Sequence, residues 1–337
     1  MQSFVTYISC FFFNIFLFIF FNKIVDLYNI YDYPDIKRKI HKYRVSLAGG
    51  FFIYLSLVFS SIFFLIFYPK YILLIFDNYF NFILFFFSSS FFFFLGYLDD
   101  KFNLSAYRKL FISSLIVSIL MIFDSSLLIT FINFSISNFQ IQLGNFSFFF
   151  TILCFLLFIN AFNMFDGINL QSGIFSIFLF LSIGYFSNLF FFLFCIIVTL
   201  IIFLFYNYRS KIFLGNSGAL FLSFVISYFL IRIFNFDKKI YSDQIFFLLI
   251  HPGFDMLRLF FVRLVNNKNP FLADKNHFHH NLLLRFKYIP TLLINLSLSI
   301  MPYIFFILFD SLLVLFVYIT IYFVLLFFLK NFKKNFI

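Results

Sequence analysis

Apolar runs of about 18 residues or more recur from one end of the chain to the other, and they constrain its fold more than any other feature. Each run is long enough to cross the roughly 30 Å hydrocarbon layer of a bilayer as a helix. Hydrophobic residues make up 64% of the 337 residues, so a water-soluble chain would lack the polar surface to cover such a core. The sequence therefore predicts an all-α membrane protein, a single domain over residues 1–337 with about 10–11 transmembrane helices.

One long segment between the expected spans is not expected to cross the membrane. Residues 124–145 are less hydrophobic and partly alternating, with Ser135 and Gln142 among the polar positions, which predicts a short hairpin on the outer surface. The first helix lacks a basic n-region and a small-residue cleavage site, so we expect it to be retained rather than cleaved as a signal. The expected spans cover about residues 4–22, 47–67, 79–97, 107–123, 147–164, 168–186, 189–206, 214–233, 243–262, 290–308 and 311–329.

The distribution of basic residues sets the expected orientation. With the N-terminus outside, all of the 24 Lys and Arg except Lys70, Arg232, Lys238 and Lys239 fall on the cytoplasmic side. The positive-inside rule predicts this orientation. The net charge of +11 thus has a topological explanation, and it does not indicate a nucleic-acid partner.

Carboxylates also gather on the cytoplasmic side, although topology alone does not require them there. All 13 acidic residues are Asp, and their position at helix ends is a first indication of a metal or substrate site. Those on the cytoplasmic side are Asp26, Asp32, Asp35, Asp99, Asp100, Asp166, Asp255 and Asp274.

Two polar islands at span ends carry adjacent or regularly spaced polar groups. In the first, Asp99-Asp100 is followed by Lys109, and the repulsion between neighbouring carboxylates favours a Mg²⁺ site or else a pair of solvated loop acids. In the second, Asn160, Asn163 and Asp166 lie at i, i+3 and i+6 and line one helix face. Such a stripe predicts a polar cavity, with hydrogen bonding between helices as the alternative.

Two further islands add glycines and histidines. Residues 213–218 place two glycines at the opening of a span, where backbone N–H groups can hold a phosphate, although this signal alone is weak. Residues 270–280 form part of a long loop that packs three His into positions 277–280 beside Asp274 and Lys275. A histidine cluster of this kind binds metal, phosphate or nothing.

Together, these islands resemble the polyprenyl-phosphate N-acetylhexosamine-1-phosphate transferases of glycosyltransferase family 4, relatives of the phospho-N-acetylmuramoyl-pentapeptide transferase. The resemblance covers nearly the whole chain, with the motifs in the same order. It is carried by Asp32-x-Pro34, Arg38-Lys39-x-His41, Gly49-Gly50, Asp99-Asp100, the stripe from Asn160 to Gly167 and the His loop.

The resemblance implies an enzyme with cytoplasmic active-site loops in the bacterial inner membrane. It would transfer a sugar 1-phosphate from a UDP-sugar to undecaprenyl phosphate and release UMP, with Mg²⁺ as cofactor and Mn²⁺ as an alternative. The lead into the His loop resembles the N-acetylhexosamine branch, so N-acetylglucosamine is the expected sugar, with N-acetylgalactosamine or a 6-deoxy N-acetyl sugar as alternatives. Such enzymes begin cell-envelope polysaccharides such as O-antigen, and a homodimer is a further expectation.

The resemblance also implies roles for individual residues. Asp99 would accept a proton from, or orient, the lipid phosphate, and Asp99, Asp100 and Asp166 would form the catalytic set. Phe213 would stack on uracil, and Lys109 would neutralise phosphate charge. The metal would be held by Asp100, Asp166 and Asn216, and the remaining substrate-binding residues would be Asn160, Asn163, Asn169, Arg263, Asp274, His277, His279 and His280.

The chain departs from the family pattern at two positions. Asn169 and Leu170 replace the second Asp and Gly of an Asp-Gly-x-Asp-Gly motif, and Asn216 stands where the family has an Asp on the metal. An amide oxygen can bind Mg²⁺ but brings no charge, so metal affinity should be lower. An active enzyme, a branch with altered metal or sugar preference, and a catalytically impaired protein all remain open.

A transporter of lipid-linked sugars is the competing interpretation. It would place polar or charged residues near the midpoints of spans, and these midpoints are almost entirely Phe, Ile, Leu and Ser. The sequence therefore favours the enzyme over the transporter.

Overall fold

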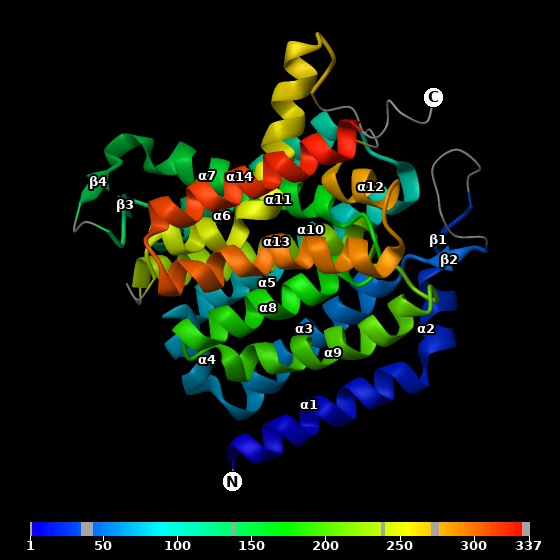
Figure 1. Ribbon diagram of the computed structural model, residues 1–337. Coiled ribbons are helices and arrows are strands. Elements are labelled where there is room, and N and C mark those ends of the chain that lie inside the picture. The colour runs from blue at the N-terminus through cyan, green and yellow to red at the C-terminus, as the bar shows by residue number, and fades with distance from the viewer. Residues whose placement is uncertain (1, 35–42, 137–138, 237–239, 271–275, 332–337) are drawn as a thin grey trace.

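A computed structural model describes residues 2–34, 43–136, 139–236, 240–270 and 276–331 of the chain (Figure 1). It is a bundle of helices with two small β-hairpins, one at each end. The elements are α1 (Gln2–Ile19), α2 (Phe21–Tyr28), β1 (Tyr31–Asp32), β2 (Val45–Ser46), α3 (Gly49–Phe67), α4 (Pro69–Phe76), α5 (Tyr79–Phe102), α6 (Ala106–Phe123), the 3₁₀ turn η1 (Ser125–Leu127), β3 (Phe131–Asn133), β4 (Gln140–Gln142), η2 (Gly144–Phe146), α7 (Ser147–Phe165), α8 (Gln171–Phe186), α9 (Phe190–Tyr208), α10 (Gly215–Phe236), α11 (Ser242–Val265), α12 (Phe278–Leu283), α13 (Tyr288–Leu308) and α14 (Ser311–Asn331).

The helices confirm an all-α polytopic membrane protein. In the described ranges, nine helices are long and apolar enough to cross a membrane, and a tenth span results if α1 and α2 count as one. Each expected span coincides with a helix, but two differ in detail. The first is broken, because α1 and α2 meet at an angle of 68°, and the one over 168–186 is the 16-residue helix α8. The predicted hairpin is confirmed by the antiparallel pairing of β3 with β4, at the end of the bundle opposite β1 and β2 (Figure 1).

Helix α10 forms the centre of the bundle, and 89% of its most apolar 18-residue stretch is buried. It packs on α3, α5, α7 and α8. Aromatic rings fill the contact with α5, where Phe92 stacks on Phe224 with centroids 4.5 Å apart. Small residues at the start of α10, Gly218 and Ala219 among them, allow the backbones of neighbouring helices to approach closely.

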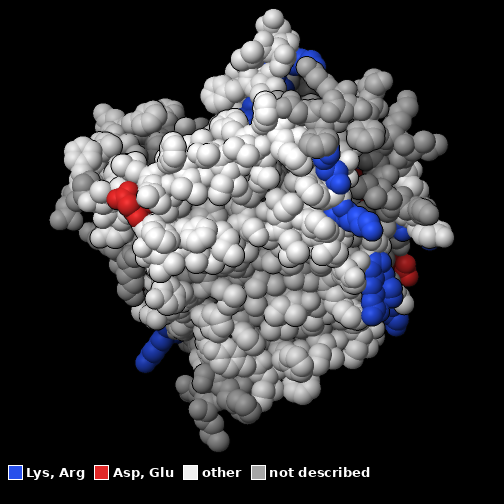
Figure 2. Space-filling view, in the orientation of Figure 1, with Lys and Arg blue, Asp and Glu red and all other residues white. Residues whose placement is uncertain are grey.

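The two ends of the bundle differ in charge. Figure 2 shows Lys and Arg side chains gathered mainly at the end where Figure 1 places β1 and β2, which we term the basic end. Helices α5 and α9 end there, and α3 and α10 begin there. The second hairpin strand, β2, is bridged in parallel to Ile212, and the Phe213 amide donates to the Ser46 carbonyl at 2.8 Å. At the basic end, loops that are far apart in sequence are therefore held together by backbone hydrogen bonds.

Candidate active site

An open cavity of about 1010 Å³ lies at the basic end, where α7 and α9 end and α8, α10 and α13 begin. Its wall combines carboxylates, amides, hydroxyls and aromatic rings. The residues of the predicted site that line it are Asp100, Asn163, Asp166, Asn169, Phe213, Asn216 and His280. The structure thus brings together residues from four helices and two loops that sequence alone could only place on the same side.

Asp100 connects α5 to the start of α10. Its Oδ1 accepts from the Asn216 amide at 2.8 Å, and its Oδ2 accepts from the Ser217 amide at 3.0 Å. The carboxylate therefore caps α10 from another helix, where the positive end of the helix dipole stabilises its charge. Tyr28 from α2 adds a hydrogen bond to Ser217 at 2.8 Å. One residue thus forms part of the cavity wall and fixes the position of Asn216.

Close backbone contact holds the start of α10 against α3 and α5. A Cβ added at Gly50 would lie 2.2 Å from the Gly218 nitrogen, and one at Gly96 would lie 2.4 Å from the Asn216 carbonyl oxygen. The Gly49 and Gly50 amides donate to the carbonyls of Phe213 and Leu214 at 3.0 and 2.9 Å. The Gly49-Gly50 motif is therefore explained by this backbone contact.

Gly50→Ala is expected to lower the stability of the fold by about 1–3 kcal/mol, because the new methyl group must displace backbone that has no room to move. The melting temperature in detergent, followed by intrinsic tyrosine fluorescence, measures this effect. Gly253→Ala is the matched control, since its Cβ would meet nothing within 4 Å. Equal melting temperatures for the two variants would contradict the packing argument.

Asp99 faces a different side from Asp100, as consecutive helical positions must. Its Oδ2 pairs with the Lys109 ammonium at 2.8 Å, and its Oδ1 accepts from the Leu104 amide at 2.8 Å. The side chain is buried, with 3% of the residue exposed. The pair therefore ties α5 to α6, and neither residue is among those that line the cavity.

Asp166 ends α7 at the cavity wall, and its Oδ1 accepts from the Ser172 hydroxyl of α8. Burial and the negative charge of Asp100 raise the pKa of Asp166 to about 6, although the Ser172 hydrogen bond acts in the opposite direction. A carboxyl of this kind is ready to bind a cation, because a positive charge would relieve both the burial cost and the repulsion.

The cavity wall offers oxygen ligands that suit Mg²⁺. Asp100 and Asp166 supply carboxylates and Asn216 supplies an amide, all facing one cavity. Hard cations such as Mg²⁺ prefer this type of donor. Among the described residues, no group of three or more His, Cys, Asp or Glu could hold a metal. The donor set therefore fits a weakly held Mg²⁺ that completes its shell with water or substrate.

Metal binding is expected to weaken as the pH falls through about 6. The pKa of Asp166 is raised from 3.8, so the carboxylate carries its charge only above about pH 6 and is neutral below. Titrating Mn²⁺ into the protein between pH 5 and pH 8, with electron paramagnetic resonance as the readout, tests this. Asp166→Asn should bind more weakly and lose part of the pH dependence, because one of the two carboxylates facing the cavity is then neutral at every pH. An unchanged profile in this variant would assign the titration to another group.

Asp255 anchors the histidine segment, residues 276–283, which carries His277, His279 and His280. Asp255 was not among the predicted site residues. Its Oδ2 accepts from the Phe278 amide at 3.3 Å and lies 3.2 Å from the His277 Nδ1. Its Oδ1 accepts from the Tyr322 hydroxyl at 2.7 Å and from the Arg258 guanidinium at 2.7 Å. One carboxylate thus joins α11, α12 and α14.

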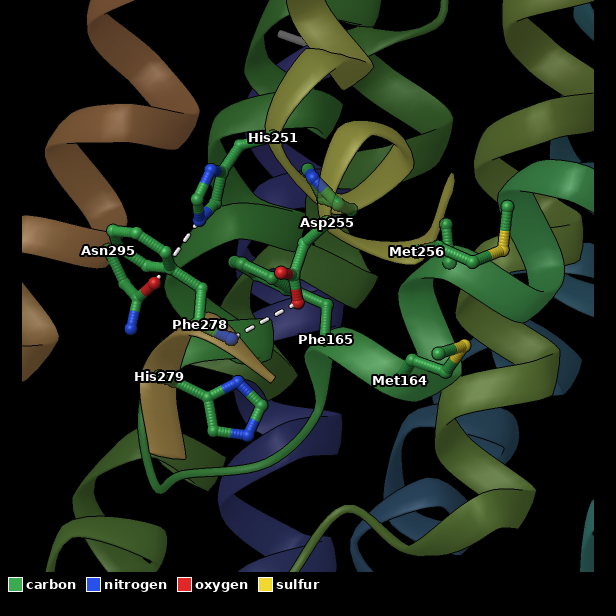
Figure 3. A pocket seen from close by; sticks show the side chains of 10 residues that line it. Met164, Phe165, His251, Asp255, Met256, Phe278, His279 and Asn295 are labelled. Atoms are coloured by element: carbon green, nitrogen blue, oxygen red, sulfur yellow. Dashed lines mark hydrogen bonds between the residues drawn. The ribbon is translucent and has the colours of Figure 1, made fainter. Parts of the chain in front are cut away.

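His279 is buried where the histidine segment meets the cavity wall. Figure 3 shows it below Asp255 and Phe278, beside a very small enclosed pocket. Its ring abuts Gly167, where an added Cβ would lie 1.9 Å from Nε2. Burial and the neighbouring His280 and His277 rings hold the pKa of His279 well below its usual range, so the imidazole is neutral near pH 7. His279 therefore adds no positive charge at this position near pH 7.

A polar cluster inside the membrane-spanning region is an exception among spans whose midpoints are almost entirely Phe, Ile, Leu and Ser. His251 of α11 contacts the Asn295 amide oxygen at 3.1 Å (Figure 3). It also contacts the Tyr318 hydroxyl at 2.9 Å. All three residues are buried. The contacts give both ring nitrogens of His251 a polar partner, so the cluster joins α11, α13 and α14.

The remaining predicted residues lie away from the cavity wall or outside the described residues. Asn160 donates to its own helix at the Leu156 carbonyl at 2.7 Å. Arg263 lies in the last turn of α11 and donates to the Pro270 carbonyl at 2.7 Å. Asp274 and the motif Arg38-Lys39-x-His41 lie outside the described residues.

The chain is similar in sequence to known proteins over most of its length. The family model described as glycosyl transferase family 4 matches residues 82–234. A Thermotoga maritima protein named undecaprenyl-phosphate alpha-N-acetylglucosaminyl 1-phosphate transferase is 32% identical over 272 residues, which cover 80% of this chain and 78% of the relative. A protein of the same name from Escherichia coli strain K12 is 26% identical over 286 residues, or 81% of this chain and 74% of the relative.

Proposed function

The chain belongs to glycosyl transferase family 4 and is a polyprenyl-phosphate sugar-1-phosphate transferase, and from that premise we propose that it transfers N-acetylglucosamine 1-phosphate from UDP-N-acetylglucosamine to undecaprenyl phosphate. UMP is the second product, and the reaction begins a cell-envelope polysaccharide. The observation that carries the proposal is the open cavity at the basic end, with Asp100, Asp166 and Asn216 facing it.

The reaction we propose is a displacement at phosphorus. An oxygen of the lipid phosphate attacks the sugar-bearing β-phosphorus of the UDP-sugar, and the bond to the bridging oxygen breaks so that UMP leaves with that oxygen. The lipid phosphate is already ionised near neutral pH, so the protein supplies position and charge neutralisation rather than a strong base. Mg²⁺ held by Asp100, Asp166 and Asn216 would neutralise diphosphate charge when bound.

The chain's own residues orient the substrates around these carboxylates. Phe213 offers a ring at the cavity wall for the uracil base, and Asn163, Asn169 and His280 offer hydrogen bonds to the sugar and diphosphate. Lys109, held by Asp99, adds positive charge toward the lipid phosphate. Both oxygens of Asp100 already accept backbone hydrogen bonds, which supports direct attack by the lipid over a covalent intermediate on this carboxylate.

The gathering of Lys and Arg at the basic end supports a cytoplasmic location for the cavity (Figure 2). In a bacterial inner membrane, this orientation gives the cavity access to a nucleotide sugar on one side. The acceptor lipid reaches it from the bilayer.

The test is UMP release and formation of lipid-diphosphate sugar by purified protein with undecaprenyl phosphate, Mg²⁺ and a panel of UDP-sugars. We expect UDP-N-acetylglucosamine to be the donor that gives the highest rate of transfer in the panel. Asp99→Asn should lower the rate, since Lys109 then loses its ion-pair partner. Product formation from a different UDP-sugar alone would change the assignment of the sugar. If no donor gave product, the proposed enzymatic function would be wrong.

Asn216→Asp is expected to lower the Mg²⁺ concentration needed for half-maximal transfer by about tenfold, because a carboxylate replaces a neutral amide ligand. The Mg²⁺ dependence of UMP release measures the shift. Asn163→Asp is the matched control, since it adds a charge to the same cavity at a position outside the proposed ligand set. A parent without transfer whose activity appears only in Asn216→Asp would identify a catalytically impaired family member.

A further inference from the structure

The flank of the bundle formed by α1 carries two adjoining depressions. The first, which we term the α1 groove, has a volume of about 520 Å³ and is lined by Phe12, Phe16 and Ile19 on α1 and by Phe59 on α3. The second, the elbow pocket, has a volume of about 540 Å³ and lies where α1 turns into α2. Ile19 lines both, so an apolar channel along the membrane continues into a polar pocket at its end.

The bend between α1 and α2 creates the elbow pocket. The two helices meet at 68°, and Figure 1 shows α1 as the outermost helix with α2 turning toward β1 and β2. Phe21 of α2 stacks on Tyr206 of α9 with centroids 4.5 Å apart, which forms an aromatic floor. The floor lies at the level where spans end and interfacial aromatic residues are favoured.

Two cations from separate loops line the elbow pocket. Arg44 precedes β2 and Lys211 follows α9, and both are exposed. The parallel bridge between Ser46 and Ile212 fixes the backbone close to each. The Lys211 ammonium lies 5.9 Å from the centroid of the Tyr206 ring. No carboxylate lines this pocket among the described residues, so its charge is positive.

We propose that the α1 groove and the elbow pocket together bind one anionic phospholipid, with an acyl chain along Phe12 and Phe16 and the headgroup between Arg44 and Lys211. The apolar groove faces the bilayer and requires an apolar occupant. The two cations at its interfacial end select a negative headgroup over a zwitterionic one, because each basic residue near a membrane surface favours anionic lipid.

The site borders the candidate active site. Ser210 lines both the elbow pocket and the cavity that contains Asp100 and Asp166. The bound headgroup would therefore brace the loop that carries Lys211 and leads into Phe213. The inference concerns binding alone, and it holds whether or not the proposed transfer is correct.

Native mass spectrometry of the full-length protein released from detergent tests the proposal by counting bound lipids. Phosphatidylglycerol and phosphatidylcholine with identical acyl chains are compared at equal concentrations. We expect the parent to prefer phosphatidylglycerol by about tenfold and R44A/K211A to lose most of that preference. Ile19→Asn should weaken binding of both lipids. Lys101→Ala with Arg108→Ala removes two exposed cations elsewhere at the basic end and should keep the preference.

Four results would overturn the assignment. They are a parent that binds both lipids equally, a control double variant that loses the preference as fully as R44A/K211A, displacement of phosphatidylglycerol by millimolar inorganic phosphate, and displacement by an equal concentration of undecaprenyl phosphate. The third result would indicate a site for soluble anions, and the fourth would assign the groove to the acceptor lipid.

Discussion

Asp166→Asn is expected to lower kcat/KM for sugar-phosphate transfer by about 100- to 1,000-fold while leaving the fold intact. The amide can still accept the Ser172 hydrogen bond, so the end of α7 keeps its partner. What is lost is the negative charge that, with Asp100, attracts a cation into the cavity. Initial rates of UMP release at saturating Mg²⁺ measure the effect.

Asp243→Asn is the matched control for Asp166→Asn. Asp243 is a buried carboxylate at the opposite end of the bundle, where it accepts from the Ser135 amide at 3.0 Å. Its replacement should leave transfer within about twofold of the parent, since the two sites are too far apart to share partners. A similar loss in both variants would mean that charge removal acts through the fold, and the catalytic assignment of Asp166 would fail.

Asp255→Ala is expected to destabilise the protein by about 3–5 kcal/mol, the usual cost of leaving one half of a buried ion pair without its partner. The Arg258 side chain is 9% exposed and would lose its carboxylate, and Tyr322, His277 and the Phe278 amide would lose an acceptor. The melting temperature in detergent reports this loss. Asp310→Ala removes an exposed carboxylate that only accepts from the Leu312 amide, and its effect should be much smaller.

A double replacement separates stability from positioning. Asp255→Leu with Arg258→Leu removes both charges, so much of the lost stability should return. His277 and the Phe278 amide still lack their acceptor, so transfer should remain low and the KM for the UDP-sugar should rise. Recovery of both stability and transfer would mean that Asp255 serves only to balance Arg258.

Much of the fold followed from the sequence because lipid imposes a simple requirement on length and polarity. Every expected span coincides with a helix, and the alternating segment around Gln142 forms the second hairpin. The bend at Phe20 did not follow, because it lies inside the expected span over residues 4–22 and no Gly or Pro marks it. Helix α8 is shorter than its span because residues 166–170 form the connection after α7, where Leu170 adopts a left-handed conformation.

The candidate site was predictable where polar residues cluster in sequence and not where they cluster only in space. Asp100, Asp166 and Asn216 stand out as interruptions at span ends, and the structure places all three on one cavity. Asp255 meets Tyr322, 67 residues further along, and no local pattern reports such a contact. A signal was present, since an Asp with Arg at i+3 inside an apolar run rarely lacks a specific role.

The central position of α10 has a consequence for how the protein is made. A helix that is almost fully enclosed, and that carries Arg232 near its end, gains little from meeting lipid alone during synthesis. Its principal neighbours are α3, α5, α7 and α8, and all of them precede it in the chain. When α10 leaves the ribosome, its binding surface has already been synthesised. Membrane insertion and packing can therefore proceed in chain order, with α11, α13 and α14 added last to the helices that already surround α10.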